Sequence, residues 1–191
     1  MGRVSDKIIG ITIILFLLIS GCGRKKTAQK IEKPEQTLKN FTMEFFDSSF
    51  KITLTGEAAE KNPAGTQAQV SKPAIEIKSK NFNIEIKTAA KGSGELFLDP
   101  DTQSVTKIVI QNNVSIVQRN PETNQVNFSA GCERLTYLEK EDTIIMDGSP
   151  WVIQGTNHYN ADRIIYSFKE NKLRFEGNVQ IRFKRAGSNN N

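Results

Sequence analysis

The chain has 191 residues, of which 37% are hydrophobic, and its 26 lysines and arginines against 21 aspartates and glutamates give a formal net charge of +5 at pH 7. This mild excess of positive charge, with no aromatic residues interleaved among the basic clusters, argues against binding to nucleic acid. One histidine and two cysteines are too few to hold a structural zinc ion, so composition also excludes that class of site.

The N-terminal segment has the layout of a bacterial signal peptide. A basic head precedes an almost uninterrupted apolar run from Ile8 to Ile19, and a basic cluster at 24–26 ends it short of the ~20 residues that a membrane-spanning helix needs. The quartet Ile19-Ser20-Gly21-Cys22 resembles a lipobox, which implies cleavage before Cys22 and a diacylglycerol on its sulfur. We therefore expect residues 1–21 to be a lipoprotein signal peptide. The alternative, an uncleaved single-pass anchor, would place the basic cluster on the side that the positive-inside rule disfavours.

Residues 22–39 are expected to form a flexible basic linker between the membrane and a folded domain. The segment is polar and rich in lysine, so it cannot bury enough apolar surface to order itself. Its positive charges, and those near the end of the chain, can lie against anionic lipid headgroups. Residues 185–191 are expected to be a polar tail.

Between residues 40 and 184 apolar and polar residues alternate with the period of two that is typical of β-strands. Turn-forming sequences such as Asn62-Pro63-Ala64-Gly65 and Asp147-Gly148-Ser149-Pro150 separate the runs. Many short strands at near-regular spacing predict an all-β antiparallel sandwich or roll. The alternating runs are Phe41–Phe45, Phe50–Leu54, Ile75–Ile77, Phe82–Ile86, Ile108–Ile110, Val114–Ile116, Ile144–Met146, Leu173–Phe175 and Val179–Phe183.

An internal repeat refines this prediction. The segment Glu133–Gly148 overlays Asp162–Gly177 at a constant offset, and in each an aromatic-bearing strand turns at an acidic tip and returns to an acidic residue followed by glycine. A looser third copy lies at Gln111–Ile116, which echoes Glu176–Ile181. The repeat predicts stacked hairpins that build one continuous sheet surface.

Parity within the repeat places one set of apolar side chains on a common face. Most such faces are closed core, so a packed interior and a ligand-binding trough both stay open as interpretations. The interior candidates are Ile108, Ile110, Ile116, Leu135, Tyr137, Ile144, Met146, Ile164, Tyr166, Leu173, Phe175, Val179 and Ile181.

Two proline-free segments, 41–46 and 178–184, are candidates for terminal edges of the sheet. Such edges can pair with a strand of another protein. The basic residues Arg182 and Lys184 can instead discourage edge pairing, as charged side chains on surface edges often do. The partner-edge candidates are Phe41, Met43, Phe45, Val179, Ile181 and Phe183.

The sequence offers no constellation typical of an enzyme. His158 is expected in a polar surface loop, without a nucleophile elbow to accompany it. With Cys22 consumed by lipid, Cys132 has no disulfide partner and is expected to be a small buried residue. We therefore expect no catalytic residue, no metal site and no cofactor.

Three groups of motifs occur in order along the chain: Phe-Thr-Met-Glu-Phe-Phe-Asp at 41–47, Lys-Pro-Ala-Ile-Glu-Ile at 72–77 with Ile-Glu-Ile-Lys-Thr-Ala-Ala-Lys-Gly at 84–92, and the repeated segment at 161–181. Their combination resembles the OstA-like periplasmic proteins of lipopolysaccharide transport, of the LptC and LptA kind. The resemblance covers about 40–184, and the single tether and the chain length make the LptC-like kind the better match. It implies a twisted, open antiparallel β jelly roll whose two sheets part around an apolar trough.

The resemblance also implies a function. Lipopolysaccharide acyl chains would ride in the trough that the interior candidates line, passed from an inner-membrane ABC transporter permease to an LptA-like bridge protein that is joined by edge-strand pairing. The expected location is the periplasmic side of the inner membrane. Because proteins of the LptC kind usually keep a transmembrane anchor, the lipobox leaves an outer-membrane location open. The alternative function is a structural envelope lipoprotein, an assembly adaptor with a closed β core and no lipid transport.

Overall fold

The computed structural model describes residues 37–46 and 49–183. In these residues the chain forms fourteen antiparallel strands and no helix, which confirms the all-β prediction, and so the described part contains no helix long and apolar enough to cross a bilayer. The expected signal peptide, most of the expected linker and the expected tail lie outside the described residues. The strands are β1 (Thr37–Phe46), β2 (Phe50–Lys61), β3 (Gln67–Ser71), β4 (Ala74–Ser79), β5 (Asn83–Thr88), β6 (Ser93–Leu98), β7 (Val105–Arg119), β8 (Val126–Leu138), β9 (Thr143–Asp147), β10 (Trp151–Gln154), β11 (Asn157–Asn160), β12 (Arg163–Ser167), β13 (Lys172–Glu176) and β14 (Gln180–Phe183).

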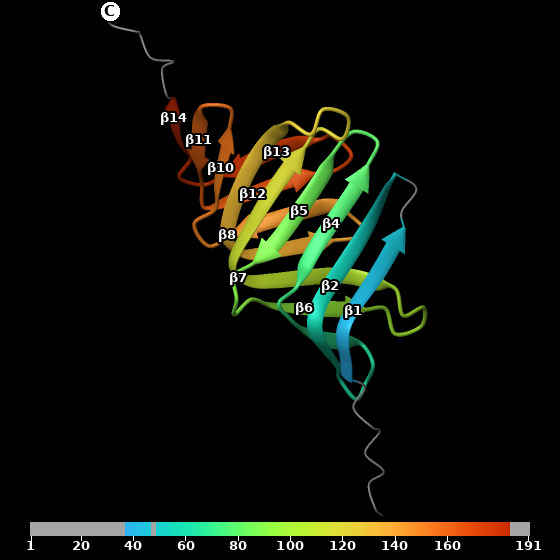
Figure 1. The fold of residues 1–191 in the computed structure, drawn as a ribbon. Helices are drawn as coiled ribbons and strands as arrows, with labels where there is room; N and C mark the ends of the chain where they lie inside the picture. The colour runs from blue at the N-terminus through green and yellow to red at the C-terminus, as the bar shows by residue number, and fades with distance from the viewer. Residues whose placement is uncertain (1–36, 47–48, 184–191) are drawn as a thin grey trace, which may run out of the picture. The chain divides into compact units, whose positions relative to one another are not determined.

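The strands build two layers that face each other across the core (Figure 1). The first layer has the order β1-β2-β4-β5-β7-β8-β10-β11-β14, and the second has the order β2-β3-β6-β7-β8-β9-β12-β13. The long strands β2, β7 and β8 belong to both. In β2, for example, Phe50–Thr55 pair with β4 in the first layer, whereas Ala58–Lys61 pair with β3 in the second. The bends in these strands join the layers along one side, as in a jelly roll.

At three of the places where the chain passes between the layers, two consecutive residues have positive φ. Asparagine and glycine tolerate this left-handed conformation better than most residues do. The third copy of the repeat, seen in the sequence at Gln111–Ile116, therefore corresponds to a crossing between layers rather than to a hairpin. The pairs are Asn112 and Asn113 (φ 75° and 54°) in β7, Gly148 and Ser149 (78° and 54°) after β9, and Gly177 and Asn178 (68° and 34°) after β13.

The two full copies of the repeat are stacked hairpins, as predicted. The end of β8 pairs with β9, β12 pairs with β13, and the pairing of β9 with β12 joins the two hairpins in the second layer. Each hairpin is closed by the same backbone hydrogen bond, from the N–H of Glu133 to the carbonyl oxygen of Gly148 (3.3 Å) and from the N–H of Asp162 to that of Gly177 (3.1 Å).

The first strand begins at Thr37, ahead of the expected domain start at residue 40. Thr37, Leu38 and Lys39 lie opposite Glu60, Ala59 and Ala58 of β2. Because β2 continues to Lys61, it offers partners to these residues, which pair although the sequence there is polar.

Candidate functional site

The interior candidates of the second layer form two apolar rows. Backbone register places Ile110, Leu135, Met146, Ile164 and Phe175 side by side on the successive strands β7, β8, β9, β12 and β13. A second row on the same strands consists of Ile108, Tyr137, Ile144, Tyr166 and Leu173. Because side chains alternate along a strand, both rows point to one face, the face that meets the first layer.

Most of these side chains are packed core rather than the wall of an open trough. The row members on β7, β8, β9 and β12 all belong to the buried hydrophobic cluster, and so does Ile116 of the first layer. Protein interiors are close-packed, so side chains fill the middle of the space between the layers in this structure. A lipid-binding role for these residues stays a prediction.

The rows lose their cover at the C-terminal end of the layers. Leu173 and Phe175 on β13 are half-buried and pack against the core. Ile181 lies opposite Tyr159 in the pairing of β14 with β11, so it shares the inward face as parity predicts. The second layer ends at β13, however, and Ile181 and Val179 are each 46% exposed. These residues lie at the margin of the interior and not within it.

On the side opposite the bends, turns of the two layers meet along a line that we call the seam. It is closed by the buried rings of Phe50, Phe82 and Phe128 from the first layer and of Tyr166 and Phe168 from the second. Ring centroids lie 5.1 Å apart for Phe50 and Phe168, 5.8 Å for Phe82 and Phe168, and 5.6 Å for Phe128 and Tyr166. Sequence reasoning missed Phe128 and Phe168; the available signal was an aromatic residue close to a turn.

A polar trio, in which Gln118 and Tyr166 are buried and Asn171 is exposed, also crosses the seam. Nε2 of Gln118 on β7 donates hydrogen bonds to Tyr166 Oη (2.7 Å) and Asn171 Oδ1 (2.9 Å), and Tyr166 Oη donates to Asn171 Oδ1 (2.6 Å). Gln118 is 3% exposed, and burial raises the pKa of Tyr166. A buried polar group left without a partner costs about 1–3 kcal/mol, so the trio favours the closed seam. Its sequence signal was a glutamine at the inward parity after Val114 and Ile116.

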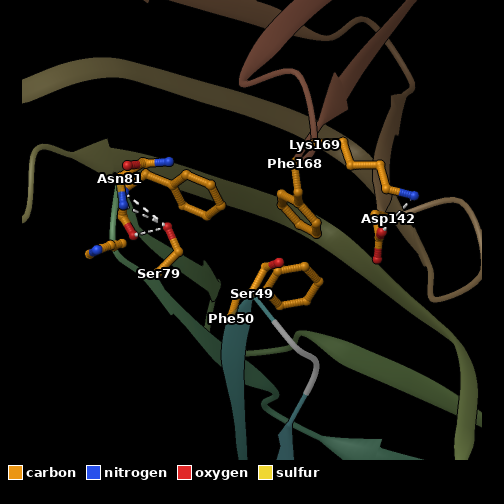
Figure 2. A pocket seen from close by; sticks show the side chains of 9 residues that line it. Ser49, Phe50, Ser79, Asn81, Asp142, Phe168 and Lys169 are labelled. Carbon is orange, nitrogen blue, oxygen red and sulfur yellow. Dashed lines mark hydrogen bonds and ion pairs between the residues drawn. The ribbon is translucent and has the colours of Figure 1, made fainter.

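A pocket of about 620 Å³ opens at the seam, and Figure 2 shows the side chains that line it. Phe50, Phe82 and Phe168 form its aromatic wall, and serine, asparagine, aspartate and lysine side chains form its rim. Nζ of Lys169 lies 3.7 Å from Asp142 Oδ2 on this rim. The pocket has the mixed polar and apolar character of an entrance rather than that of a deep lipid site.

Two further pockets lie at opposite ends of the layers. One of about 480 Å³ opens beside the trio, where the ring of Tyr159 stacks on Phe175 with centroids 5.2 Å apart and Leu173 and Tyr166 complete an apolar wall. The other pocket, of about 180 Å³ and mostly apolar, is lined by Leu38, Met43, Ala59, Lys61, Ala68, Leu96 and Leu98. The two layers thus have a pocket at each end, with packed core between the two pockets.

Three strands are edges of the layers in the described part of the chain: β1 pairs only with β2, β13 only with β12, and β14 only with β11. On β1, Phe41 is buried and Met43 and Phe45 pack against the core, so a partner strand would meet the backbone there rather than these side chains. On β14, Ile181 and the 71% exposed Phe183 offer apolar surface as well.

The remaining chemical candidates do not assemble an active site. His158 lies on β11 and not in the predicted polar loop; its ring meets Trp151 edge-on at 6.1 Å between centroids, and its Nε2 is buried without a hydrogen-bond partner among the described residues. Cys132 is a buried free thiol, as predicted. Burial, and after it the negative charges of Asp147 and Glu133, raise the pKa of this thiol to about 12, which disfavours the nucleophilic thiolate form. The described residues contain no cluster of three or more histidine, cysteine or acidic side chains that could hold a metal ion.

Comparisons with known proteins point to one family. The model of the family described as LptA/(LptD N-terminal domain) LPS transport protein matches residues 24–172. Among solved structures, the chain is similar to LptH, the LptA homologous periplasmic component of the lipopolysaccharide transport device of Pseudomonas aeruginosa. The match has a TM-score of 0.52 and 11% identity and covers 70% of this chain and 94% of that one, so it shows a common fold. No curated protein matches the sequence.

Proposed function

We propose that the β domain of this chain is a periplasmic bridge component that binds lipopolysaccharide acyl chains between its two layers. The chain belongs to the family of LptA and LptD N-terminal domain proteins of LPS transport, and the proposal follows from this membership. The observation that carries this proposal is the course of the two apolar rows. They run unbroken across the second layer and end at Leu173 and Phe175, where cover is lost and a pocket of about 480 Å³ begins. An acyl chain that extends the rows would supply the missing cover.

The energetics favour transfer between like sites. Burying one methylene group contributes about 0.8 kcal/mol, so a chain of about a dozen gains on the order of 10 kcal/mol before ordering costs. A lipid held in this way does not leave for water, but it moves at little cost into an adjoining apolar groove. The direction of transfer then comes from an inner-membrane ABC transporter permease that loads this component.

Continuity between components requires paired sheet edges. β1 at one end of the first layer and β14 at the other each leave one side of the backbone without a partner strand in the described structure. An LptA-like protein that adds a strand to either edge would extend the first layer across the interface. The apolar face of β14, with Ile181 and Phe183, would then continue into the partner.

The experiment that tests lipid binding is photocrosslinking in cells. A photoreactive phenylalanine analogue at Phe175, which points into the interior, is expected to form an adduct with lipopolysaccharide. The matched control is the same analogue at Arg174, the next residue on β13, whose side chain is exposed on the outer face. Equal adducts at the two positions would contradict the proposal, and so would the absence of any adduct at Phe175 and Ile181.

A second candidate function is favoured by the packed middle of the interior. In that case the chain is a structural envelope lipoprotein, an assembly adaptor whose closed core carries no lipid. The same crosslinking experiment separates the two functions, because an adaptor gives no lipid adduct from the inward positions. Neither function involves catalysis.

The proposal includes a tether at Cys22, which lies outside the described residues and rests on the lipobox-like quartet. Acyl chains on this cysteine would hold the domain at the periplasmic side of the inner membrane or at the outer membrane. Cells fed labelled palmitate are expected to label the wild-type chain and not a Cys22→Ser variant. Label that persists in the variant would disprove lipidation at this residue, and fractionation of the labelled cells would assign the membrane.

A further inference from the structure

A row of alternating charge crosses the outer face of the second layer. Arg134 on β8 lies opposite Asp147 on β9, Asp147 lies opposite Arg163 on β12, and Arg163 lies opposite Glu176 on β13. The signs therefore run positive, negative, positive, negative, with one residue for each strand. Opposite charges directly across a strand pair stabilise that pairing, whereas like charges weaken it.

The contact between the two hairpins shows how the row works. Nε of Arg163, at the start of the second hairpin, donates a hydrogen bond of 2.9 Å to Oδ1 of Asp147, at the end of the first. This bond and the nearby negative charges of Asp147 and Glu176 raise the pKa of Arg163. The acidic residue at the end of the first hairpin, Asp147, thus pairs with a basic residue, Arg163, on the strand that lies next to it in the sheet.

Glu176 is the repeat counterpart of Asp147, but β13 has no next strand in the described structure. Its carboxylate is held by Arg174 of its own strand, with Nη2 and Oε1 3.0 Å apart, and its side chain stays 41% exposed. The row therefore ends at an edge with an acidic residue that has Arg163 opposite it on β12 and, in the described structure, no strand on its other side.

The path of the described chain, up to residue 183, leaves this edge without a neighbouring strand. After β13, the N–H of Asp162 donates a hydrogen bond to the carbonyl oxygen of Gly177 (3.1 Å), and Nδ2 of Asn178 donates one to Asp162 Oδ2 (2.9 Å). Both bonds direct the chain toward β12, on the far side from the free edge. On the inner face, half-buried Leu173 and Phe175 continue the apolar rows, and the second layer has no further described strand beyond them.

We infer that the free edge of β13 receives an antiparallel strand of a partner protein that carries a basic residue opposite Glu176 and bulky apolar residues one and three positions later. This is the pattern of Arg163-Ile164-Ile165-Tyr166, the strand that the equivalent edge of β9 receives within the chain. The inference rests on the proposed function only in that bridge components meet through sheet edges. It assigns the second layer its own docking edge, with a charge rule for the incoming strand.

The charge rule separates β13 from β14. The outward side chain of Arg182 on β14 would repel a basic residue at the corresponding position of an incoming strand. A strand of the inferred pattern is therefore directed to the second layer, and a partner that engages both layers must present different sequences to the two edges.

The inference is tested without lipid, using the full chain and a labelled peptide that copies residues 161–168, Ala-Asp-Arg-Ile-Ile-Tyr-Ser-Phe. We expect the peptide to bind at least about fivefold more tightly than a version in which its arginine is replaced by glutamate, and to slow amide hydrogen exchange in β13. The Glu176→Lys variant is expected to reverse the preference. The Glu170→Lys variant, which makes the same charge change in the exposed turn before β13, is expected to keep it.

Three outcomes would overturn the inference: no binding by the arginine peptide, equal binding of the two peptides, or slowed exchange at β1 or β14 in place of β13. Protection in the free chain of those β13 amides that point away from β12 would also overturn it, since the edge would then be covered. Because lipid is absent from this assay, its failure leaves the crosslinking test of acyl-chain binding unaffected.

Discussion

Replacing Phe168 with alanine is expected to lower the free energy of unfolding by about 3–5 kcal/mol. The ring of Phe168 is buried at the centre of the seam and contacts the rings of Phe50, Phe82, Tyr137 and Tyr166, with centroid distances from 5.1 to 5.9 Å. Its removal leaves a cavity that the surrounding β-strands cannot fill by collapse. Urea unfolding of the purified chain, followed by circular dichroism, measures the loss.

The matched control is Phe183→Ala, since Phe183 is 71% exposed at the edge strand β14. Substitutions at such surface positions usually change stability by less than about 0.5 kcal/mol. If Phe168→Ala proved no more harmful than Phe183→Ala, the aromatic cluster would not be a structural core, and the closed seam would have to be abandoned.

The same aromatic rings bear on the proposed transport. Each aromatic pair contributes about 0.5–1.5 kcal/mol beyond its buried area, so the pairs across the seam together amount to several kcal/mol. The ~10 kcal/mol that a buried acyl chain gains before ordering costs is of comparable size. Opening the seam therefore exchanges ring-to-ring contacts for ring-to-lipid contacts, which allows the empty form to be closed and the loaded form to be open without a large net cost.

The repeat was the part of the fold that the sequence predicted best. Alternation fixed the inward parity of Leu135 and Ile164, and the conserved offset between the two copies placed both in one row. These predictions succeed because strand register within a hairpin is a local property, set by the turn and by the apolar face.

What the sequence could not predict depends on contacts between distant segments. Gln118 on β7 meets Tyr166 and Asn171 only because the layers fold onto each other, and the paired glutamine and tyrosine are far apart in the chain. Likewise, parity placed Ile181 correctly on the inward face but could not tell that the second layer ends before reaching it. Burial is a property of the opposing layer, so a period of two alone cannot separate core from margin.

Replacing Phe175 with aspartate is expected to weaken the binding of lipopolysaccharide at least about tenfold. Full burial of a phenylalanine side chain contributes about 1.5–3 kcal/mol, and every 1.4 kcal/mol corresponds to a factor of ten in affinity. The carboxylate would also lie at the end of both apolar rows, where a bound acyl chain would strip it of water at further cost. Equilibrium binding of purified lipopolysaccharide to the full chain measures the change.

The control must carry the same added charge without touching the interior, because lipopolysaccharide is itself anionic. Ser167→Asp meets this condition: Ser167 is on the outer face of β12, opposite Lys172 of β13, the strand that carries Phe175 on its inner face. If repulsion alone weakened binding, the two variants would lose affinity equally. A loss confined to Phe175→Asp, in a variant that unfolds at nearly the wild-type urea concentration, would place the acyl chains between the layers. Unchanged binding in both variants would place the bound lipid away from the end of the apolar rows and contradict the proposed site, whereas no binding by the wild-type chain would leave the closed-core adaptor as its function.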